Sequence, residues 1–335
     1  MLLFDWKETH MSNKQKNIWD SFRSFGHIGS FRMLAQNDDC IIIRVENETG
    51  EGDMIIHQVF AGVYLMYNDF HMAYYDSTYQ AAETVLAIDY CREGSLTMEC
   101  DNGFYQVKNA GSICIDSRVH HKGIARFPTS HFHGVTIGFE HEIADRTLKE
   151  EIPGIPIDLA GIRDKFCGHD GYFIEKDNET LKRLFTDLYH VPEKAKQQYF
   201  KAKVLELLVC LDAMEKQKAT EKAYFYKDQV EKTNAAMRLM TEDLSRDYTI
   251  DELSARFDLS STALKTCFKS IYGKPIYTWL KEYRLQKAQE MLIKDPEMSI
   301  GDIAFSVGYE SAGKFSAAFK KKCGMTPKEY RNQPH

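Results

Sequence analysis

One pattern of residues occurs twice in the last part of the chain, and it constrains the fold more than any other sequence feature. The first copy is a short amphipathic helix over 250–257, a turn, and a second helix that ends at Gly273. The second copy runs over 300–307, through a turn at Gly308, into a helix that ends at Gly324. The copies are about 50 residues apart, with one residue inserted in the second turn. We therefore predict two helix-turn-helix units.

Each copy has an apolar side and a serine placed to cap its second helix, Ser261 in the first and Ser311 in the second. The residues predicted to face inward are Leu264, Phe268, Ile271, Phe315 and Phe319. A long helix over about 276–293 is predicted to join the two copies. Two short helices held apart at a fixed spacing can enter successive major grooves of DNA, about 34 Å apart, whereas one alone contacts few bases. The doubled pattern therefore favours sequence-specific DNA binding.

The charge distribution agrees with this interpretation, although the net charge of the chain is −6. From Ser260 to the end there are 13 Lys and Arg against 7 Asp and Glu, a net of +6, which leaves −12 for the rest. Phosphate binding requires local positive charge and not a basic protein as a whole. The asymmetry is typical of a basic DNA-reading part attached to an acidic body.

The first half of the chain has the signals of short strands and tight turns. The apolar and β-branched runs lie at 40–45, 62–66, 84–89, 95–100, 104–107, 112–115 and 135–139. Between two of them, Asp101-Asn102-Gly103 is a strong hairpin turn. Short strands at regular spacing predict a sandwich or a barrel.

A helical hairpin is predicted after the strands, over 180–188 and 197–214. Two interpretations of its apolar stripe remain open, packing against the barrel or a seam between two copies of the chain. The residues of the possible dimer seam are Leu181, Leu184, Leu188, Leu205 and Leu208. The polar segment 216–227 is predicted to be a linker.

The doubled pattern closely resembles the AraC (AraC/XylS) family of transcription regulators. The matching residues include Ile303-Ala304, Gly308-Tyr309, Ser311, Phe315, Phe319-Lys320, Gly324, Thr326-Pro327 and Tyr330-Arg331, and, in the first copy, Asp251-Glu252-Leu253, Leu259-Ser260, Leu264, Phe268-Lys269, Gly273, Tyr283-Arg284-Leu285 and Ala288. The resemblance covers about a hundred residues, and it implies an all-α DNA-binding domain at 228–335 with two helix-turn-helix motifs. Most of these residues are expected to be structural, because the apolar ones form the core and the glycines serve turns.

Outward positions on the two recognition helices are the candidates for contact with double-stranded DNA. The expected base-reading residues are Thr262, Lys265, Thr266, Gly313, Lys314 and Ala317. The expected phosphate-binding residues are Ser261, Lys269, Ser311, Lys320 and Lys321. The second helix offers few hydrogen-bonding side chains, so we expect Lys265→Ala to reduce sequence discrimination more than Lys314→Ala.

For residues 1–175 the resemblance implies a cupin-like β-barrel that senses a small molecule, followed by the hairpin at 176–215. It also implies RNA polymerase and a second copy of the chain as partners. Aromatic and polar side chains of the barrel are the candidates for ligand binding. They are Tyr64, Tyr67, Tyr74, Tyr90, Arg92 and His133.

Two kinds of enzyme are disfavoured. Catalytic cupins supply a His-x-His pair and a Glu from one strand and a further His from a later one, but the segment 84–89 holds no histidine. His131 and His133 would share one face of a strand, yet no partner carboxylate and histidine precede them in the expected place. Alkyl-accepting repair proteins with a similar helix-turn-helix carry a Pro-Cys-His-Arg motif, which is absent. We therefore expect no catalysis, no cofactor and no metal.

The remaining features are those of a cytoplasmic regulator. The eight cysteines are single, without a C-x-x-C pair, and are expected to be reduced thiols. No apolar run approaches the roughly 20 residues that cross a bilayer, and residues 1–17 do not resemble a secretory signal. Two alternatives to a ligand-controlled regulator stay open, a ligand-independent DNA-binding dimer and a metal-cupin enzyme fused to a regulator.

Overall fold

The computed structural model divides the chain into two compact units. The N-terminal unit comprises Met1–Gly94 and Ala110–Glu221, and the C-terminal unit comprises Ser95–Asn109 and Lys222–His335. The residues that the structure describes are 31–37, 40–77, 85–100, 103–119, 121–168, 171–175, 178–215 and 224–333. Among these residues, no helix has the length and apolar character needed to span a membrane.

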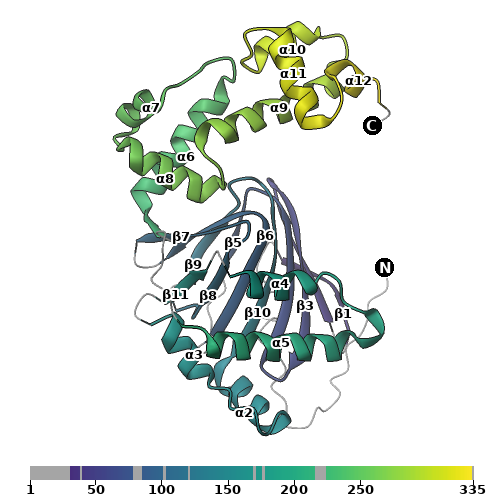
Figure 1. Cartoon of the computed structure of the whole chain (residues 1–335), viewed down its shortest axis with the longest axis vertical. Coiled ribbons are helices and arrows are strands. Elements are labelled where there is room, and N and C mark those ends of the chain that lie inside the picture. Colours follow the sequence, from purple (N-terminus) through teal and green to yellow (C-terminus); the bar gives the residue numbers. More distant parts are fainter. Residues whose placement is uncertain are drawn as a thin grey trace. The chain divides into compact units, whose positions relative to one another are not determined.

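The N-terminal unit is built on an antiparallel half-barrel sheet (Figure 1). Its strands are β1 (Phe31–Gln36), β2 (Cys40–Asn47), β3 (Gly50–Phe60), β4 (Val63–His71), β5 (Tyr74–Ser77), β6 (Val85–Cys100, which continues into the C-terminal unit), β8 (Ile113–Asp116), β9 (His121–Arg126), β10 (Phe132–Glu140) and β11 (Tyr172–Glu175). The order of the main path is β1-β2-β3-β4-β10-β6. Every neighbouring pair along it is antiparallel, so one hydrogen-bonded ladder follows the next across the sheet.

Two helices, α4 (Glu179–Asp187) and α5 (Lys196–Ala213), lie across one face of this sheet (Figure 1). Residues two apart on a strand share a face, and Leu65 and Ile137 are cross-strand partners on the covered one. They belong to one buried apolar cluster with Phe185 and Phe200 of the helices. The helical hairpin therefore buries its apolar stripe against the sheet of its own chain.

This packing decides between the two interpretations of the predicted dimer-seam residues. Leu181, Leu184, Leu188 and Leu208 are at most 1% exposed within the single chain, and Leu205 is partly buried against the same cluster. Side chains that are already covered leave no apolar area for a second copy. The hairpin leucines are thus core residues, as in the first interpretation.

The opposite face of the sheet carries a buried polar network centred on Arg118. Its guanidinium donates hydrogen bonds to Asp89, at 2.8 Å, and to Asp116, at 3.1 Å. The hydroxyl of Thr136 donates to Asp89 at 2.8 Å, and the Asn68 amide donates to Thr136 at 3.2 Å. Two carboxylates hold the pKa of Arg118 above its usual value against the opposing effect of burial. Removing Arg118 would leave two buried carboxylates without their cation.

Several elements of this unit differ from the sequence prediction. The predicted strands at 84–89 and 95–100 are parts of the single long strand β6. The strands β1, β3, β5, β9 and β11 and the helices α2 (His141–Glu151) and α3 (Leu159–Phe166) were not predicted. Of the predicted hairpin turn, Asp101 and Asn102 lie outside the described residues.

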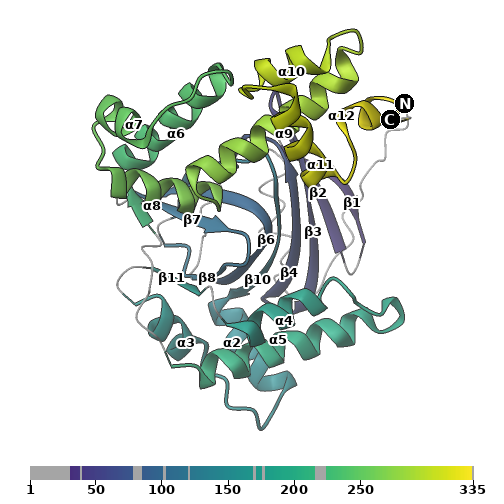
Figure 2. The same ribbon diagram turned by 45° about the horizontal axis from the view of Figure 1, so that its top comes forward.

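The C-terminal unit is mainly helical (Figure 2). It has two apolar clusters. Its helices are α6 (Lys227–Glu242), α7 (Ile250–Phe257), α8 (Ser261–Tyr272), α9 (Ile276–Lys294), α10 (Ile300–Ser306), α11 (Ala312–Cys323) and α12 (Pro327–Arg331). The long helix α9 contributes Ile276 and Leu280 to the first cluster and Leu285 and Leu292 to the second. One helix thus supplies part of the core of both helix-turn-helix motifs, and its bounds agree with those of the predicted joining helix.

A β-hairpin also belongs to this unit, and sequence reasoning did not assign it there. It consists of the end of β6 and strand β7 (Phe104–Asn109). A third short strand, β12 (Tyr224–Tyr226), pairs with β7. Tyr105 and Val107 of β7 are buried in the same apolar cluster as Phe268 of α8. The Asn109 amide donates a hydrogen bond to the Ser270 carbonyl at 2.9 Å.

The predicted linker is shorter than expected, because Tyr224–Tyr226 form strand β12 and α6 begins at Lys227. The rest of the predicted linker, 216–223, lies outside the described residues. The Lys227 ammonium is 2.7 Å from a Glu99 carboxylate oxygen, which gives the hairpin a further attachment.

We predict that Val107→Ala destabilises the C-terminal unit. Val107 is 4% exposed, so the lost methyl groups should lower the free energy of unfolding by about 2 kcal/mol. Hydrogen exchange at the slowest α8 amides, followed by mass spectrometry, should accelerate roughly 30-fold. The matched control is Val209→Ala, because Val209 is 50% exposed and its truncation removes little packing. Unchanged exchange in α8 would show that the hairpin does not support the helix-turn-helix core.

Candidate DNA-binding surface

The first helix-turn-helix motif is defined by strong local capping signals. Thr249 and Glu252 form a reciprocal capping box at the start of α7. Asp258 ends α7 in a left-handed conformation, with φ of 49°. The backbone N–H of Ala263 donates to the Ser260 hydroxyl at 3.1 Å, which makes Ser260 the N-cap of α8. The motif therefore starts and stops its helices with side chains from its own turn.

The prediction that Ser261 caps α8 is wrong. Its hydroxyl donates to the Asp251 carboxylate at 3.0 Å and lies 3.3 Å from the Ser254 hydroxyl. Both serines stand at the start of the helix, and the carboxylate of Asp251 engages the second of them. Ser261 thus links α7 to α8 across the turn, while Ser260 satisfies the first backbone donors of α8.

The second motif has the predicted caps. The backbone N–H of Lys314 donates to the Ser311 hydroxyl at 3.2 Å, so Ser311 is the N-cap of α11. Gly273 and Gly324 end α8 and α11 with φ of 74° and 75°, in the left-handed region that glycine adopts without steric cost. At Gly308, in the inserted turn, a Cβ would lie 2.2 Å from the Leu244 carbonyl oxygen. Only glycine fits the close backbone approach that the insertion requires.

Both recognition helices have one buried and one exposed side. On α8, Leu264, Phe268 and Ile271 are fully buried, as predicted. On α11, Phe315 and Phe319 are fully buried, also as predicted. The exposed residues on the two helices include Thr262, Lys265, Thr266, Lys269, Gly313, Lys314, Ala317, Lys320 and Lys321. All of these were candidates for DNA contact from the sequence, and their side chains are accessible to a ligand as large as DNA.

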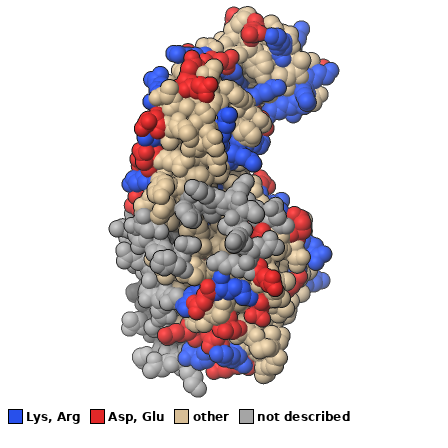
Figure 3. Space-filling model, turned by 60° about the vertical axis from the view of Figure 1, so that its left-hand side comes forward, with Lys and Arg blue, Asp and Glu red and all other residues tan. Residues whose placement is uncertain are grey.

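The exposed lysines differ in their electrostatic partners. Lys314 forms an ion pair with Glu310, one turn away. Within the described part of the chain, Lys265 has no ion pair or side-chain hydrogen bond. In Figure 3, Lys and Arg side chains gather along one side of the part that holds α9 to α12. The surface therefore has the positive charge that a phosphate backbone attracts.

Several polar and aromatic residues of the pattern hold the helices of this unit together. The Arg331 guanidinium donates to the Met298 carbonyl at 2.7 Å, and Tyr330 packs edge-on against Phe319 with ring centroids 5.4 Å apart. On α9, Arg284 donates to the Asp247 carboxylate at 2.9 Å and to the Arg246 carbonyl at 3.2 Å. These bonds attach α12 and α9 to the connecting loops, so the two recognition helices are supported from behind.

The structure brings three of the predicted ligand-binding residues together around Tyr189. The Arg92 guanidinium lies 4.3 Å from the Tyr189 ring centroid, and the rings of His133 and Tyr67 are 5.2 and 5.8 Å away. Burial lowers the pKa of His133, with smaller opposing effects from Asp69 and Glu93. Sequence reasoning missed Tyr189, which directly follows the last predicted residue of the first hairpin helix.

The other predicted ligand-binding residues lie apart from this cluster or deep in the core. Tyr90 stacks on Phe185 at 5.3 Å and is part of the apolar cluster beneath the hairpin. Tyr64 packs against Gly138 on the other face of the sheet. The Tyr74 hydroxyl donates to Glu48 near a strand end. The six residues therefore do not line one cavity.

Comparison with known proteins matches the region of the two motifs. A family profile described as "Helix-turn-helix domain" matches residues 253–333. The HTH-type transcriptional regulator ExsA of Pseudomonas aeruginosa is 29% identical over 92 residues, 28% of this chain and 33% of ExsA. An AraC-like transcription regulator of Streptomyces lividans is 31% identical over 99 residues, 30% of this chain and 32% of that protein. The matched part thus spans about a third of the length of these curated relatives.

Among solved structures, unsaturated fatty acid bound wild-type ToxT from Vibrio cholerae strain SCE256 is 13% identical to this chain. That similarity covers 80% of this chain and 94% of the ToxT chain, with a TM-score of 0.31.

We predict that Ser260→Ala destabilises the first motif more than Ser261→Ala. Loss of the N-cap acceptor should lower the free energy of unfolding by about 1 kcal/mol, because a backbone donor of α8 loses its partner. Ser261→Ala removes side-chain hydrogen bonds to Asp251 and Ser254 but leaves the backbone donors of α8 satisfied, so it should have a smaller effect. Urea unfolding of each full-length variant measures the difference, and the opposite order would contradict the capping assignment.

Proposed function

We propose that this chain, a member of the AraC family of transcription regulators by its C-terminal domain, reads specific DNA sequences through α8 and α11. The observation that carries the proposal is the division of each helix into a fully buried apolar side and an exposed polar side. A helix that is anchored on one side presents its other side to the major groove with little rotational freedom.

The base-reading role belongs to Thr262, Lys265 and Thr266 on α8, and to Gly313, Lys314 and Ala317 on α11. Lys265 and the two threonines supply hydrogen-bonding groups for base edges, whereas α11 offers Lys314 and small apolar groups suited to thymine methyls. The first recognition helix therefore provides most of the sequence discrimination.

The phosphate-binding role belongs to Ser261, Lys269, Ser311, Lys320 and Lys321. These residues lie at the start of each recognition helix or further along its exposed side. Contacts to phosphates position a protein on the duplex and do not distinguish one base pair from another.

The N-terminal unit, proposed to be cupin-like, controls DNA binding in response to a small molecule. The half-exposed group of Tyr67, Arg92 and His133 around Tyr189 supports a ligand with an aromatic or anionic part. Strand β6 supports the coupling, because its residues 85–94 belong to this unit and its end joins the hairpin in the helix-turn-helix core. The ligand acts only if it binds one arrangement of the chain better than another.

The remaining partners are RNA polymerase and a second copy of the chain. Since the predicted seam leucines are buried within one chain, a homodimer would use a different surface. We further propose that the protein has no catalytic activity. It acts in the cytoplasm, where RNA polymerase and a second copy of the chain are both accessible.

We predict that a selection from random duplex DNA with the full-length protein yields a site with two conserved elements. Their centres should be about one helical turn apart, because α8 and α11 enter successive major grooves. A footprint on the selected fragments measures the spacing. Repeating the selection with small-molecule extracts tests the ligand separately. Binding without sequence preference under both conditions would refute the regulator assignment.

We predict that Lys265→Ala relaxes sequence discrimination more than Lys314→Ala. The Lys265 ammonium has no competing partner in the described residues, and a good contact to a base is worth about 1–3 kcal/mol of discrimination. Lys314 is paired with Glu310 and should contribute less. Competition binding across single-base variants of the selected site measures both losses, and equal losses would contradict the prediction.

We predict that Lys320→Ala weakens binding to all sequences about equally. If Lys320 neutralises one phosphate, the slope of log affinity against log salt concentration should fall by about one. Lys149→Ala on α2 is the control, because Lys149 is an exposed lysine of the N-terminal unit. A sequence-dependent loss would assign Lys320 to base reading.

A further inference from the structure

A cluster of histidines and carboxylates lies on the N-terminal sheet, where the sequence suggested no metal site. In the sequence, no partner carboxylate and histidine precede His131 and His133 in the expected place. The register of the sheet supplies both. Phe132 of β10 pairs with Phe70 of β4, so the adjoining residues His131 and His71 are brought side by side. Asp69 is two residues before His71 and shares its face of β4.

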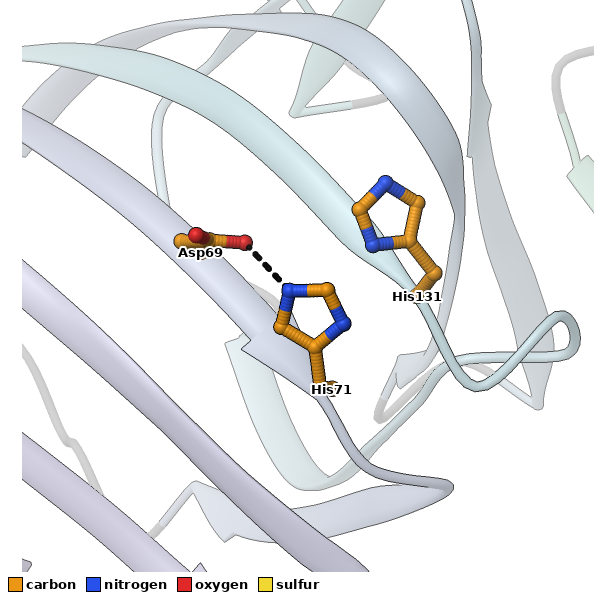
Figure 4. A group of neighbouring side chains, drawn as sticks. All are labelled: Asp69, His71 and His131. Carbon is orange, nitrogen blue, oxygen red and sulfur yellow. Dashed lines mark ion pairs between the residues drawn. The ribbon is translucent and has the colours of Figure 1, made fainter. Parts of the chain in front are cut away.

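The three side chains converge on a common point (Figure 4). The His71 Nε2 atom is 3.1 Å from an Asp69 carboxylate oxygen, and the His71 and His131 ring centroids are 4.9 Å apart. One potential ligand atom of each residue lies within 4.8 Å of those of the other two. A ring nitrogen of His131 faces His71 in Figure 4. On the other edge of the same ring, Glu93 Oε2 is 3.6 Å from His131 Nε2, so Glu93 is placed to orient the imidazole.

One atom of this cluster lacks the partner that its burial demands. The Nδ1 atom of His131 is buried and has no hydrogen-bond partner among the described residues. A buried polar atom without a partner costs free energy, and in native proteins such atoms are explained by a water, an ion or a functional role. A metal ion would satisfy it.

The backbone at both histidines is held in place by close contacts that require glycine. A Cβ at Gly50 would lie 2.0 Å from the His71 carbonyl oxygen, and one at Gly94 would lie 2.0 Å from the His131 carbonyl oxygen. Both glycines have positive φ, 144° and 78°. The two histidines therefore project from positions whose backbone is fixed by neighbouring backbone.

We propose that Asp69, His71 and His131 bind a divalent transition-metal ion, with Glu93 orienting the His131 ring from its other edge. Two imidazoles with one carboxylate form a ligand set that suits Zn²⁺ best and Ni²⁺ or Cu²⁺ as well. Mg²⁺ and Ca²⁺ prefer sites made of oxygen atoms alone. Bonds of about 2.0–2.2 Å in a tetrahedral site place ligand atoms roughly 3.5 Å apart. Small side-chain rotations would bring the ligand atoms, which lie within 4.8 Å of one another, to this separation.

Metal binding would connect the end of β4 to the residue that precedes β10. An ion that binds only the folded state raises its stability by mass action. The metal site is independent of the proposed DNA-binding function, since all its residues lie in the N-terminal unit.

The test uses the full-length protein without an affinity tag, stripped of metal by a chelator and kept reduced. Zn²⁺ is titrated in competition with a chromophoric chelator. We expect one tightly bound equivalent. In the double variant His71→Ala/His131→Ala, the affinity for this Zn²⁺ ion should fall more than about 100-fold, because two ligands are lost. His190→Ala is the matched control, an exposed histidine outside the cluster that should leave the affinity unchanged.

Further readouts separate a metal site from a structural role of the histidines. Asp69→Asn keeps the size of the side chain, and we expect about 10–100-fold weaker binding. Zn²⁺ should raise the melting temperature of the wild-type protein and of His190→Ala, and not that of the double variant. Circular dichroism establishes that each variant is folded. Cobalt substituted for zinc should give the visible bands of nitrogen and oxygen ligation. Intense thiolate-to-cobalt bands, or an unchanged tight equivalent in the double variant, would overturn the proposal.

Discussion

Strand β6 is hydrogen-bonded on both edges, to β10 on one side and to β8 and then β7 on the other. Its register decides which residues face the helical hairpin and which face the polar network. A shift of one residue would turn Ile88 away from the core and bring Asp89, the partner of Arg118, into it. The strand also joins two units whose cores are otherwise separate. The geometry of both units therefore depends on one ladder of backbone hydrogen bonds.

The C-terminal helices could be predicted to within a residue or two, because their signals are local. Caps such as Thr249 and Ser311, and glycines that end helices, act within a few positions of the chain. The one error in capping, Ser261 for Ser260, arose because either serine can serve as a cap in isolation. The choice depends on Asp251, on a different helix, whose carboxylate engages Ser261.

The N-terminal unit was less predictable, since strand pairing joins residues far apart in the chain. The sequence predicted separate strands at 84–89 and 95–100, yet β6 continues through the segment between them, paired with β10 as far as Gly94. The same reason hid the histidine cluster, because His71 and His131 become neighbours only through the pairing of β4 with β10. A helical DNA-binding domain joined to a strand-rich domain could thus be derived from the sequence. Which side chains lie together on each face of the sheet could not.

Gly313 occupies the first turn of α11, and a Cβ there would meet no atom within 4 Å. The position is exposed, and the helix is anchored by Phe315 and Phe319 on its other side. A new side chain can therefore be introduced without repacking the core, and replacing a helical glycine removes a cost of about 0.5–1 kcal/mol. Under the proposed base-reading role of Gly313, target choice and fold stability are separable at this residue. One substitution could redirect the protein to a different operator, which makes α11 a natural starting point for evolving or engineering new regulatory circuits.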